Sequence, residues 1–250
     1  MTLIDMHAHL FLSSDLEEQT SLLLRTAEIY GIDRLCISSL AGFFPREEEV
    51  GEANRAAYRF AKEHPSLVSA YTYVSPELEN AELTLRRGIE DHAAIGAKVW
   101  VSEKCDSPRM NAIAECLISY RKPLLIHAFQ KSTGQVAKES TAQNVRALAR
   151  RYPELSIVMA HAGGNCYAGV EAVRDLPNVL ADVSGTTPKR GEVEYAVRLL
   201  GEDRVLFGSD LPCGSFALPL GKVLEASVSE AAREKILCKN ALRLFRNFER

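Results

Sequence analysis

The amino-acid sequence predicts an α/β protein in which a single (β/α)8 barrel, the TIM-barrel architecture, spans residues 1–250. Eight short apolar runs recur along the chain, and their starting points lie 23 to 35 residues apart. That interval fits one strand, one helix and two short loops. A length of 250 residues suits one such barrel, and no linker or shift in composition divides the chain.

The apolar runs are the expected parallel strands, with the helices between them. The runs cover residues 3–9, 32–40, 67–74, 94–101, 122–129, 155–163, 178–185 and 203–210. A helical apolar period appears in 16–30, 50–64, 79–92, 107–120, 140–151, 166–175 and 191–200, with one or two more helices in 228–248. Alternating strands and helices favour a parallel sheet covered by helices, and eight units favour its closure. An open, doubly wound sheet is the alternative.

Composition and charge exclude several classes of protein. Hydrophobic residues make up 46% of the chain and charged residues 25%, as in a typical globular protein. The net charge of −3 gives no reason to expect a nucleic acid or an anionic membrane as partner. The N-terminal residues do not resemble a signal peptide, and no apolar run approaches the roughly 20 residues of a membrane span. Six scattered cysteines without a CxxC pair indicate a reducing cytoplasm.

Histidines and one aspartate gather at the ends of the predicted strands. His7 and His9 alternate at the end of the first strand, so their side chains point to the same face. His127 ends the fifth run, His161 the sixth and Asp210 the eighth. The carboxyl ends of the strands are where a barrel carries its catalytic residues. Neutral imidazoles with a carboxylate suit Zn²⁺ or a similar divalent ion, so we expect a metal or catalytic site at this rim.

Sequence motifs at these strand ends resemble those of the amidohydrolase superfamily, and within it the "amidohydrolase 2" branch. That branch includes decarboxylase-like and lactonase-like members. The resemblance covers nearly the whole chain. The matching segments are IDMHAH (4–9), GAKVW (96–100), LLIHAF (124–129), MAHAGG (159–164), LADVSG (180–185), VLFGSDLP (205–212) and ILCKNALRLF (236–245).

The resemblance implies one divalent ion, usually Zn²⁺, although Mn²⁺ or another divalent ion would also suit such ligands. It implies His7, His9 and His127 as ligands and Asp210 as a ligand or a base. His161 would then act on a metal-activated water or orient the substrate. Such an ion lowers the pKa of bound water to about 7, which would make it a nucleophile at neutral pH.

Further positions form an outer group of candidates. Lys98 is expected inside the barrel, because an ammonium group facing the apolar helix layer would be costly. It would be a charge partner of Asp210 or of a substrate carboxylate, a purely structural lysine, or a carbamate bridging two ions as in binuclear relatives. Asp5 would orient a ligand or be structural, Trp100 would form a pocket wall, and Arg190 would meet an anionic substrate. Loop positions that would reach a substrate are Phe43, Phe44, Tyr73, Glu103, Lys104, Lys131, Thr186 and Thr187.

The leading hypothesis is therefore hydrolysis of an amide, lactone or ester-like bond in a small polar or carboxylated molecule. Metal-dependent decarboxylation on the same scaffold is the alternative. A TatD-like nuclease is disfavoured, because that pattern has Glu where this chain has Lys98. A metal-binding barrel without catalysis is the remaining possibility. The small molecule is the expected partner, and a homo-oligomer is compatible with the sequence.

Overall fold

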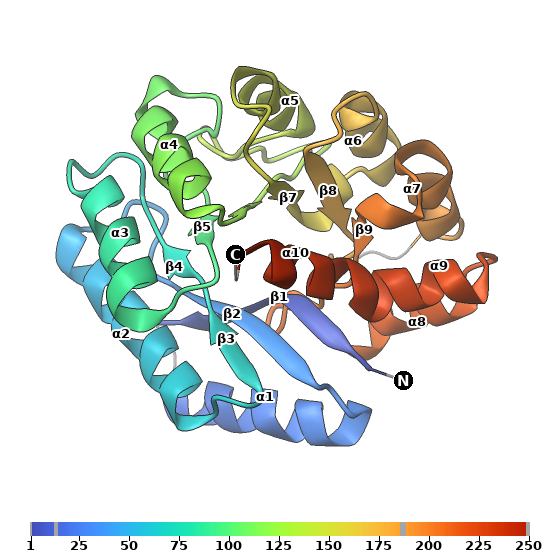
Figure 1. Ribbon diagram of the computed structural model, residues 1–250, viewed down its shortest axis with the longest axis horizontal. Helices are drawn as coiled ribbons and strands as arrows, with labels where there is room; N and C mark the ends of the chain where they lie inside the picture. The colour runs from blue at the N-terminus through green and yellow to red at the C-terminus, as the bar shows by residue number, and fades with distance from the viewer. Residues whose placement is uncertain (1, 13–14, 186–188, 249–250) are drawn as a thin grey trace.

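The computed structural model describes residues 2–12, 15–185 and 189–248, which form a ring of parallel strands surrounded by helices (Figure 1). Each predicted run contains a strand, and the run 67–74 contains two. The strands are β1 (Ile4–Phe11), β2 (Arg34–Leu40), β3 (Val68–Ala70), β4 (Thr72–Tyr73), β5 (Ala97–Val99), β6 (Leu124–Ile126), β7 (Ile157–Met159), β8 (Val179–Asp182) and β9 (Val205–Leu206). All paired strands are parallel, as predicted.

The strands pair as two sheets, β1-β2-β3 and β4-β5-β6-β7-β8-β9, which join end to end. The first join lies at Tyr71, whose N–H donates to the carbonyl of Ile37 at 2.8 Å, while the next N–H, of Thr72, donates to Gly96 at 2.9 Å. The second join closes the ring, because the N–H of Met6 donates to the carbonyl of Phe207 at 3.1 Å. The predicted (β/α)8 barrel is thus confirmed, and the open sheet is excluded.

The helices cover the outside of the barrel. They are α1 (Leu16–Tyr30), α2 (Glu47–Glu63), α3 (Ala81–His92), α4 (Asn111–Tyr120), α5 (Ala142–Arg151), α6 (Cys166–Val173), α7 (Glu192–Leu200), α8 (Ala217–Glu225), α9 (Glu230–Glu234) and α10 (Asn240–Phe248). Helix α1 begins where the Asp15 carboxylate accepts the N–H groups of Glu17 and Glu18, and it ends at Gly31 with φ of 63°. Among the described residues, no helix is long and apolar enough to cross a bilayer.

Helix α8 was not predicted. It contains Pro219 and Gly221, the two residue types that weaken a helical pattern most. Pro219 falls in the first turn, where its missing N–H costs no intrahelical hydrogen bond. Leu220 and Val223 bury one face of the helix, so tertiary packing outweighs its weak intrinsic propensity.

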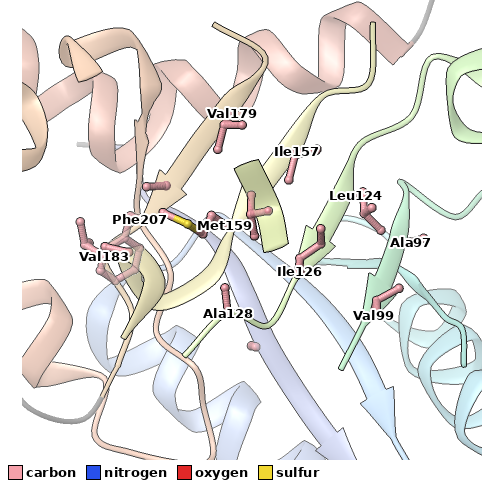
Figure 2. Close-up of a cluster of buried hydrophobic side chains, with 14 of the residues drawn as sticks. Ala97, Val99, Leu124, Ile126, Ala128, Ile157, Met159, Val179, Val183 and Phe207 are labelled. Carbon is pink, nitrogen blue, oxygen red and sulfur yellow. The ribbon is translucent and has the colours of Figure 1, made fainter. Parts of the chain in front are cut away.

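Most buried apolar residues of the described chain belong to two layers. The outer layer lies between strands and helices, and Figure 2 shows Ala97, Leu124, Ile157 and Val179 at one level of four neighbouring strands. The inner layer fills the barrel, and side chains of the C-terminal helical segment join it. Its members are Ile4, Met6, Cys36, Tyr71, Leu125, Val158, Ala160, Leu180, Leu206, Cys238, Ala241 and Leu244. Helix α10 lies across the end of the barrel where its side chains join this inner layer (Figure 1). The opposite end of the barrel is left for a site.

Candidate metal centre

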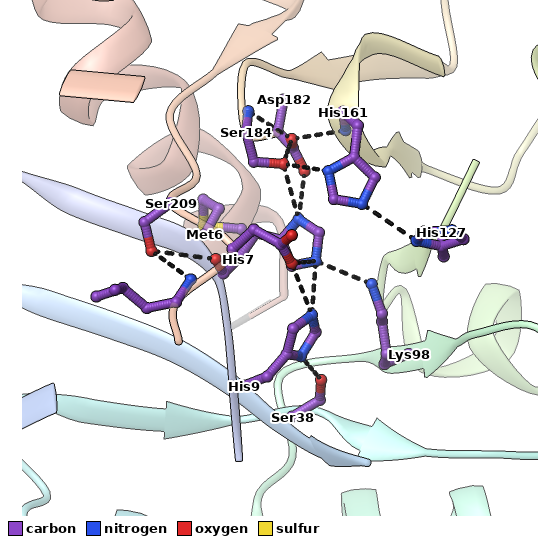
Figure 3. Close-up of polar contacts among 12 residues, drawn as sticks. Met6, His7, His9, Ser38, Lys98, His127, His161, Asp182, Ser184 and Ser209 are labelled. Carbon is purple, nitrogen blue, oxygen red and sulfur yellow. Dashed lines mark hydrogen bonds and ion pairs between the residues drawn. The ribbon is translucent and has the colours of Figure 1, made fainter. Parts of the chain in front are cut away.

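Two imidazoles and a carboxylate converge inside the barrel. The Nε2 atoms of His7 and His9 lie 2.9 Å apart (Figure 3). The Oδ1 atom of Asp210 lies 3.5 Å from Nε2 of His7 and 3.3 Å from Nε2 of His9. Both imidazoles are buried, and Asp210 is 15% exposed. Three electron-pair donors that face one another at these distances form a donor set that suits a divalent cation.

A β-bulge in β1 aims both histidines inward. The pairing with β2 shifts between Asp5 and Ala8, so the simple alternation of side chains breaks there. Met6 packs in the inner layer although it precedes His7 directly. Strict alternation along the strand would give Asp5 the same direction as His7 and His9, and the bulge removes that relationship.

Asp5 instead supports the backbone around the site. Its Oδ1 accepts the N–H of His7 at 3.0 Å and the N–H of Ser209 at 2.9 Å. Burial raises the pKa of Asp5 to about 6, although Ser209 and His7 lower it in part. The carboxylate thereby ties the bulge to the segment that carries Asp210.

The other nitrogen of each imidazole has a partner of its own. The Nδ1 atom of His7 lies 2.9 Å from Oδ2 of Asp182, and Nδ1 of His9 lies 2.8 Å from the hydroxyl of Ser38. Such contacts fix the tautomer and turn Nε2 towards a metal. Burial lowers the pKa of His9 to about 3, so this ring is neutral at pH 7, as a ligand must be.

His127 and His161 form a second pair beside the first. The Nδ1 atom of His127 lies 3.1 Å from Nε2 of His161 (Figure 3). His127 directs its Nε2 to Oε1 of Glu139 at 2.9 Å, and His161 directs its Nδ1 to the hydroxyl of Ser184 at 2.9 Å. Burial lowers the pKa of both imidazoles, that of His161 well below its usual value.

His161 also lies close enough to the first group to be a ligand. One atom each of His7, His161 and Asp210 lies within 4.8 Å of the others. The structure thus brings His7, His9, His161 and Asp210 to one place, and His127 joins them through His161. It leaves two roles open for His161, as a ligand or as a proton carrier.

Two of these groups stand on strained backbone. His161 has φ of 58° and ψ of 22°, and Asp210 has φ of 62°. Non-glycine residues rarely adopt this left-handed region, and each costs about 1–3 kcal/mol where it occurs at a site. The N–H of His161 donates to Asp182 Oδ1 at 2.9 Å, and that of Asp210 donates to the carbonyl of His7 at 2.7 Å. These contacts hold both side chains toward the barrel interior.

Lys98 lies inside the barrel with no exposed surface, as the sequence indicated. Its Nζ is 3.0 Å from Nε2 of His7 (Figure 3). Burial lowers the pKa of Lys98 to about 8, while Asp210 and Asp182 raise it in part. The ammonium group is therefore a neighbour of the candidate ligands rather than of the helix layer.

A cavity of about 210 Å³ opens above this cluster. His9, His127 and Asp210 lie at its base. Trp100 is one wall, and its ring centroid lies 5.0 Å from that of Phe43 and 6.2 Å from that of Phe11. The remaining lining residues are Leu40, Val101, Lys131, Val136, Glu139 and Cys213. Mostly apolar walls over a polar base are typical of a small-molecule site.

Only some of the other candidate residues lie at the cavity. Phe43 and Lys131 line the cavity, as expected of loop residues that reach a substrate. Arg190 is exposed and lines a separate outer hollow beside α7 and α8, so its predicted contact with substrate has no support from this geometry. Tyr73 is fully buried. Phe44, Glu103 and Lys104 do not line the cavity, and Thr186 and Thr187 lie outside the described residues.

Sequence reasoning missed four residues that hold the histidines: Ser38, Glu139, Asp182 and Ser184. Asp182 ends the seventh predicted strand, in the same position that singled out His127 and Asp210, so that rule would have found it. Glu139 gave no such signal, because it lies in the loop between β6 and α5.

The chain resembles known proteins over nearly its whole length. A family model described as "Amidohydrolase" matches residues 4–247. No curated protein matches significantly. Among solved structures, 2,6-dihydroxybenzoate decarboxylase from Rhizobium is similar with a TM-score of 0.83 at 18% identity, covering 98% of this chain and 99% of that one.

Two further structures share the fold. A dihydroxybenzoic acid decarboxylase from Polaromonas sp. JS666, with bound manganese and the inhibitor 2-nitroresorcinol, has a TM-score of 0.79 at 18% identity and covers 98% of this chain and 97% of that one. An uncharacterized TIM-barrel protein from Bordetella bronchiseptica has a TM-score of 0.76 at 15% identity, with 100% of both chains covered. At these identities the likeness establishes the barrel fold.

Proposed function

Because the chain belongs to the amidohydrolase family, whose model matches residues 4–247, we propose that it is a metal-dependent enzyme that decarboxylates a small aromatic acid. The observation that carries the proposal is the cavity walled by Phe11, Phe43 and Trp100, which opens directly on His9, His127 and Asp210. An aromatic ring fits between such walls by stacked or edge-to-face contact. Its carboxylate would then lie at the polar base.

The family and the manganese-bound neighbour support a divalent ion as cofactor, with Zn²⁺ and Mn²⁺ both compatible with the donor set. Nε2 of His7, Nε2 of His9 and the carboxylate of Asp210 would hold it. Nδ1 of His127 is the natural fourth donor, because Glu139 occupies the other nitrogen of that ring. When bound, the ion would supply positive charge that orients and polarises substrate oxygen atoms.

Decarboxylation replaces carbon dioxide with a proton on the same carbon, so the site needs a proton carrier near the base of the cavity. His161 and Asp210 are the candidates. Ser184 occupies Nδ1 of His161, which leaves Nε2 to face the cluster. The hydroxyl of Ser184 donates in turn to Asp182, so the ring is held by a buried chain of hydrogen bonds. We assign proton transfer to His161. To Asp210 we assign ion binding and a share in that proton transfer.

Two decarboxylases among the similar structures act, by their names, on dihydroxybenzoic acids, which supports the aromatic substrate class. Hydrolysis is the second candidate function. The position of His161 favours it, because a neutral imidazole with Nε2 facing the cluster would also accept a proton from a water nucleophile.

The test uses the purified protein loaded with Zn²⁺ or Mn²⁺ and a panel of hydroxybenzoic acids that includes 2,6-dihydroxybenzoate. We expect release of carbon dioxide from at least one acid, abolished in His161→Gln with metal content unchanged. Turnover of lactones or amides, without carbon dioxide release from any acid, would overturn decarboxylation in favour of hydrolysis. Loss of the ion in His161→Gln would instead make His161 a ligand.

A further inference from the structure

A second cavity, of about 330 Å³, lies beside His161. His161 and Ser184 form part of its wall, and His161 also belongs to the candidate metal cluster. Lys131 lines both this cavity and the aromatic one. A substrate whose reacting group lies at the cluster would therefore have this second space next to it, beside His161 and Lys131.

The second cavity is rich in cationic donors. Three ammonium groups line it: Lys131 from the loop after β6, Lys189 just before α7 and Lys222 from α8. Among the described lining residues, Glu192 supplies the one carboxylate. The hydroxyl-bearing residues Ser132 and Thr133 add neutral donors. These lysines come from three separate segments, so the fold brings them together and their sequence positions do not. Their convergence gives the space a net positive character.

The donors of these ammonium groups are only partly used. Lys222 is 10% exposed, and its Nζ lies 3.7 Å from Glu192, beyond hydrogen-bond distance. Lys189 has no carboxylate within ion-pair distance among the residues that the structure describes. Lys131 contacts Glu139 at 2.9 Å, which engages one of its three N–H groups. Lys189 is exposed and Lys131 is 33% exposed, so the argument from burial concerns Lys222. A mostly buried ammonium group is costly without good partners, so an anion beside Lys222 would complete this site.

We propose that the second cavity binds an anionic group of the substrate, a carboxylate or phosphate distinct from the group that reacts at the cluster. This inference rests on the proposed function only for the position of the reacting group. It makes the preferred substrate an aromatic acid with a second anionic group, so that one group lies at the base of the aromatic cavity and the other beside Lys189 and Lys222. Hydroxybenzoic acids with one carboxylate would then be weaker substrates. Lys189, Glu192 and Lys222 also line the outer hollow, so simple solvation of these lysines is the competing explanation.

The experiment titrates inorganic phosphate into the metal-loaded protein by calorimetry. We expect Lys189→Gln and Lys222→Gln each to weaken binding about tenfold, since a hydrogen bond to a charged group contributes about that factor. Lys222→Arg should retain binding, because it keeps the charge. Lys62→Gln, at an exposed position of α2, is the matched control and should leave binding unchanged.

Equal phosphate affinity in the wild type, Lys189→Gln and Lys222→Gln would overturn the proposal, and it would place any bound phosphate at the metal or at an adventitious site. Within the described part of the chain, neither lysine side chain has a hydrogen bond or ion pair to the cluster, so both variants should keep the ion. The metal content of each variant is measured in parallel. Phosphate binding that depends on these lysines, without carbon dioxide release from any acid, would refute the proposed function and leave the anion site standing. Carbon dioxide release, together with phosphate binding that does not depend on these lysines, would refute the anion site alone.

Discussion

The Glu139 carboxylate orients the His127 imidazole through Nε2, the ring nitrogen that does not contact His161. The distance from Oε1 of Glu139 to Nε2 of His127 is 2.9 Å, and the carboxylate is only 3% exposed. Its other oxygen accepts from Nζ of Lys131 at 2.9 Å and from Nε2 of Gln135 at 2.7 Å. The ring is therefore oriented by a carboxylate that is itself held on both sides, and Nδ1 is the nitrogen left to face the cluster.

We predict that Glu139→Gln weakens metal binding or activity about 10- to 100-fold, the usual cost of removing such a supporting carboxylate. The amide keeps the size of the side chain but lacks the charge that favours the Nε2–H tautomer of His127. Competition with a chelator of known affinity measures the change. Glu154→Gln, at an exposed position, is the control. Unchanged affinity and turnover in Glu139→Gln would show that His127 is oriented without this contact.

The strands and the rim site could be predicted because each rests on a local signal. Buried parallel strands appear as short apolar runs, and a polar residue that ends such a run reaches the same rim as its equivalents. His127 and Asp210 were found in this way, although 83 positions separate them in the chain. Their convergence follows from closure of the ring, which the number of strand–helix units already implied.

The features that the sequence did not predict depend on strand pairing and on loops, which leave no periodic signal in the sequence. The bulge that separates the direction of Asp5 from that of His7 is set by the register against β2. Glu139 reaches His127 through an irregular loop, and α8 forms around Pro219 because its apolar face is buried. These features need tertiary contacts to exist, so local sequence patterns cannot reveal them.

Acidification should destabilise the fold below about pH 6.5, the ordinary pKa of histidine. Burial lowers the pKa of His9 to about 3 and also lowers those of His127 and His161. The unfolded chain therefore binds more protons than the folded chain as the pH falls below 6.5, and the free energy of unfolding decreases until the folded pKa is reached. Each unit of pKa difference corresponds to about 1.4 kcal/mol.

Two other groups modify this trend in opposite directions. Asp5, with its pKa raised to about 6, stabilises the fold as the pH falls from 6 to 4, but one carboxyl opposes three imidazoles. The low pKa of Asp182 adds a further loss below its unfolded value near pH 4. Denaturant unfolding from pH 7.5 to 4 tests the prediction, and His9→Gln should show a shallower slope. Constant stability over that range would contradict it.

Trp100 should determine how well the aromatic cavity binds its substrate. We expect Trp100→Ala to raise KM for an aromatic acid about tenfold, because the variant loses a stacking wall and its apolar contact area. The ion should stay bound, since the contacts of the Trp100 ring are with Phe11 and Phe43 and not, among the described residues, hydrogen bonds to the candidate ligands. Phe44→Ala is the control, because Phe44 is 63% exposed and lies outside the cavity. A fall in kcat with KM unchanged would place Trp100 in the chemistry instead.

The cluster should hold one divalent ion per chain. His7 and His9 each direct Nε2 toward Asp210, while Asp182 and Ser38 contact their Nδ1 atoms. The two Nε2 atoms and the Asp210 carboxylate therefore suffice for a single ion. Lys98 lies 3.0 Å from His7 Nε2 and would have to become a carbamate to bridge a second one. Elemental mass spectrometry should therefore find about one equivalent, which His7→Ala abolishes, and the intact mass should carry no carbon dioxide adduct. Lys98→Met should then keep that equivalent. Two equivalents that fall to one or none in Lys98→Met would reveal a binuclear centre and reassign Lys98 as its bridge.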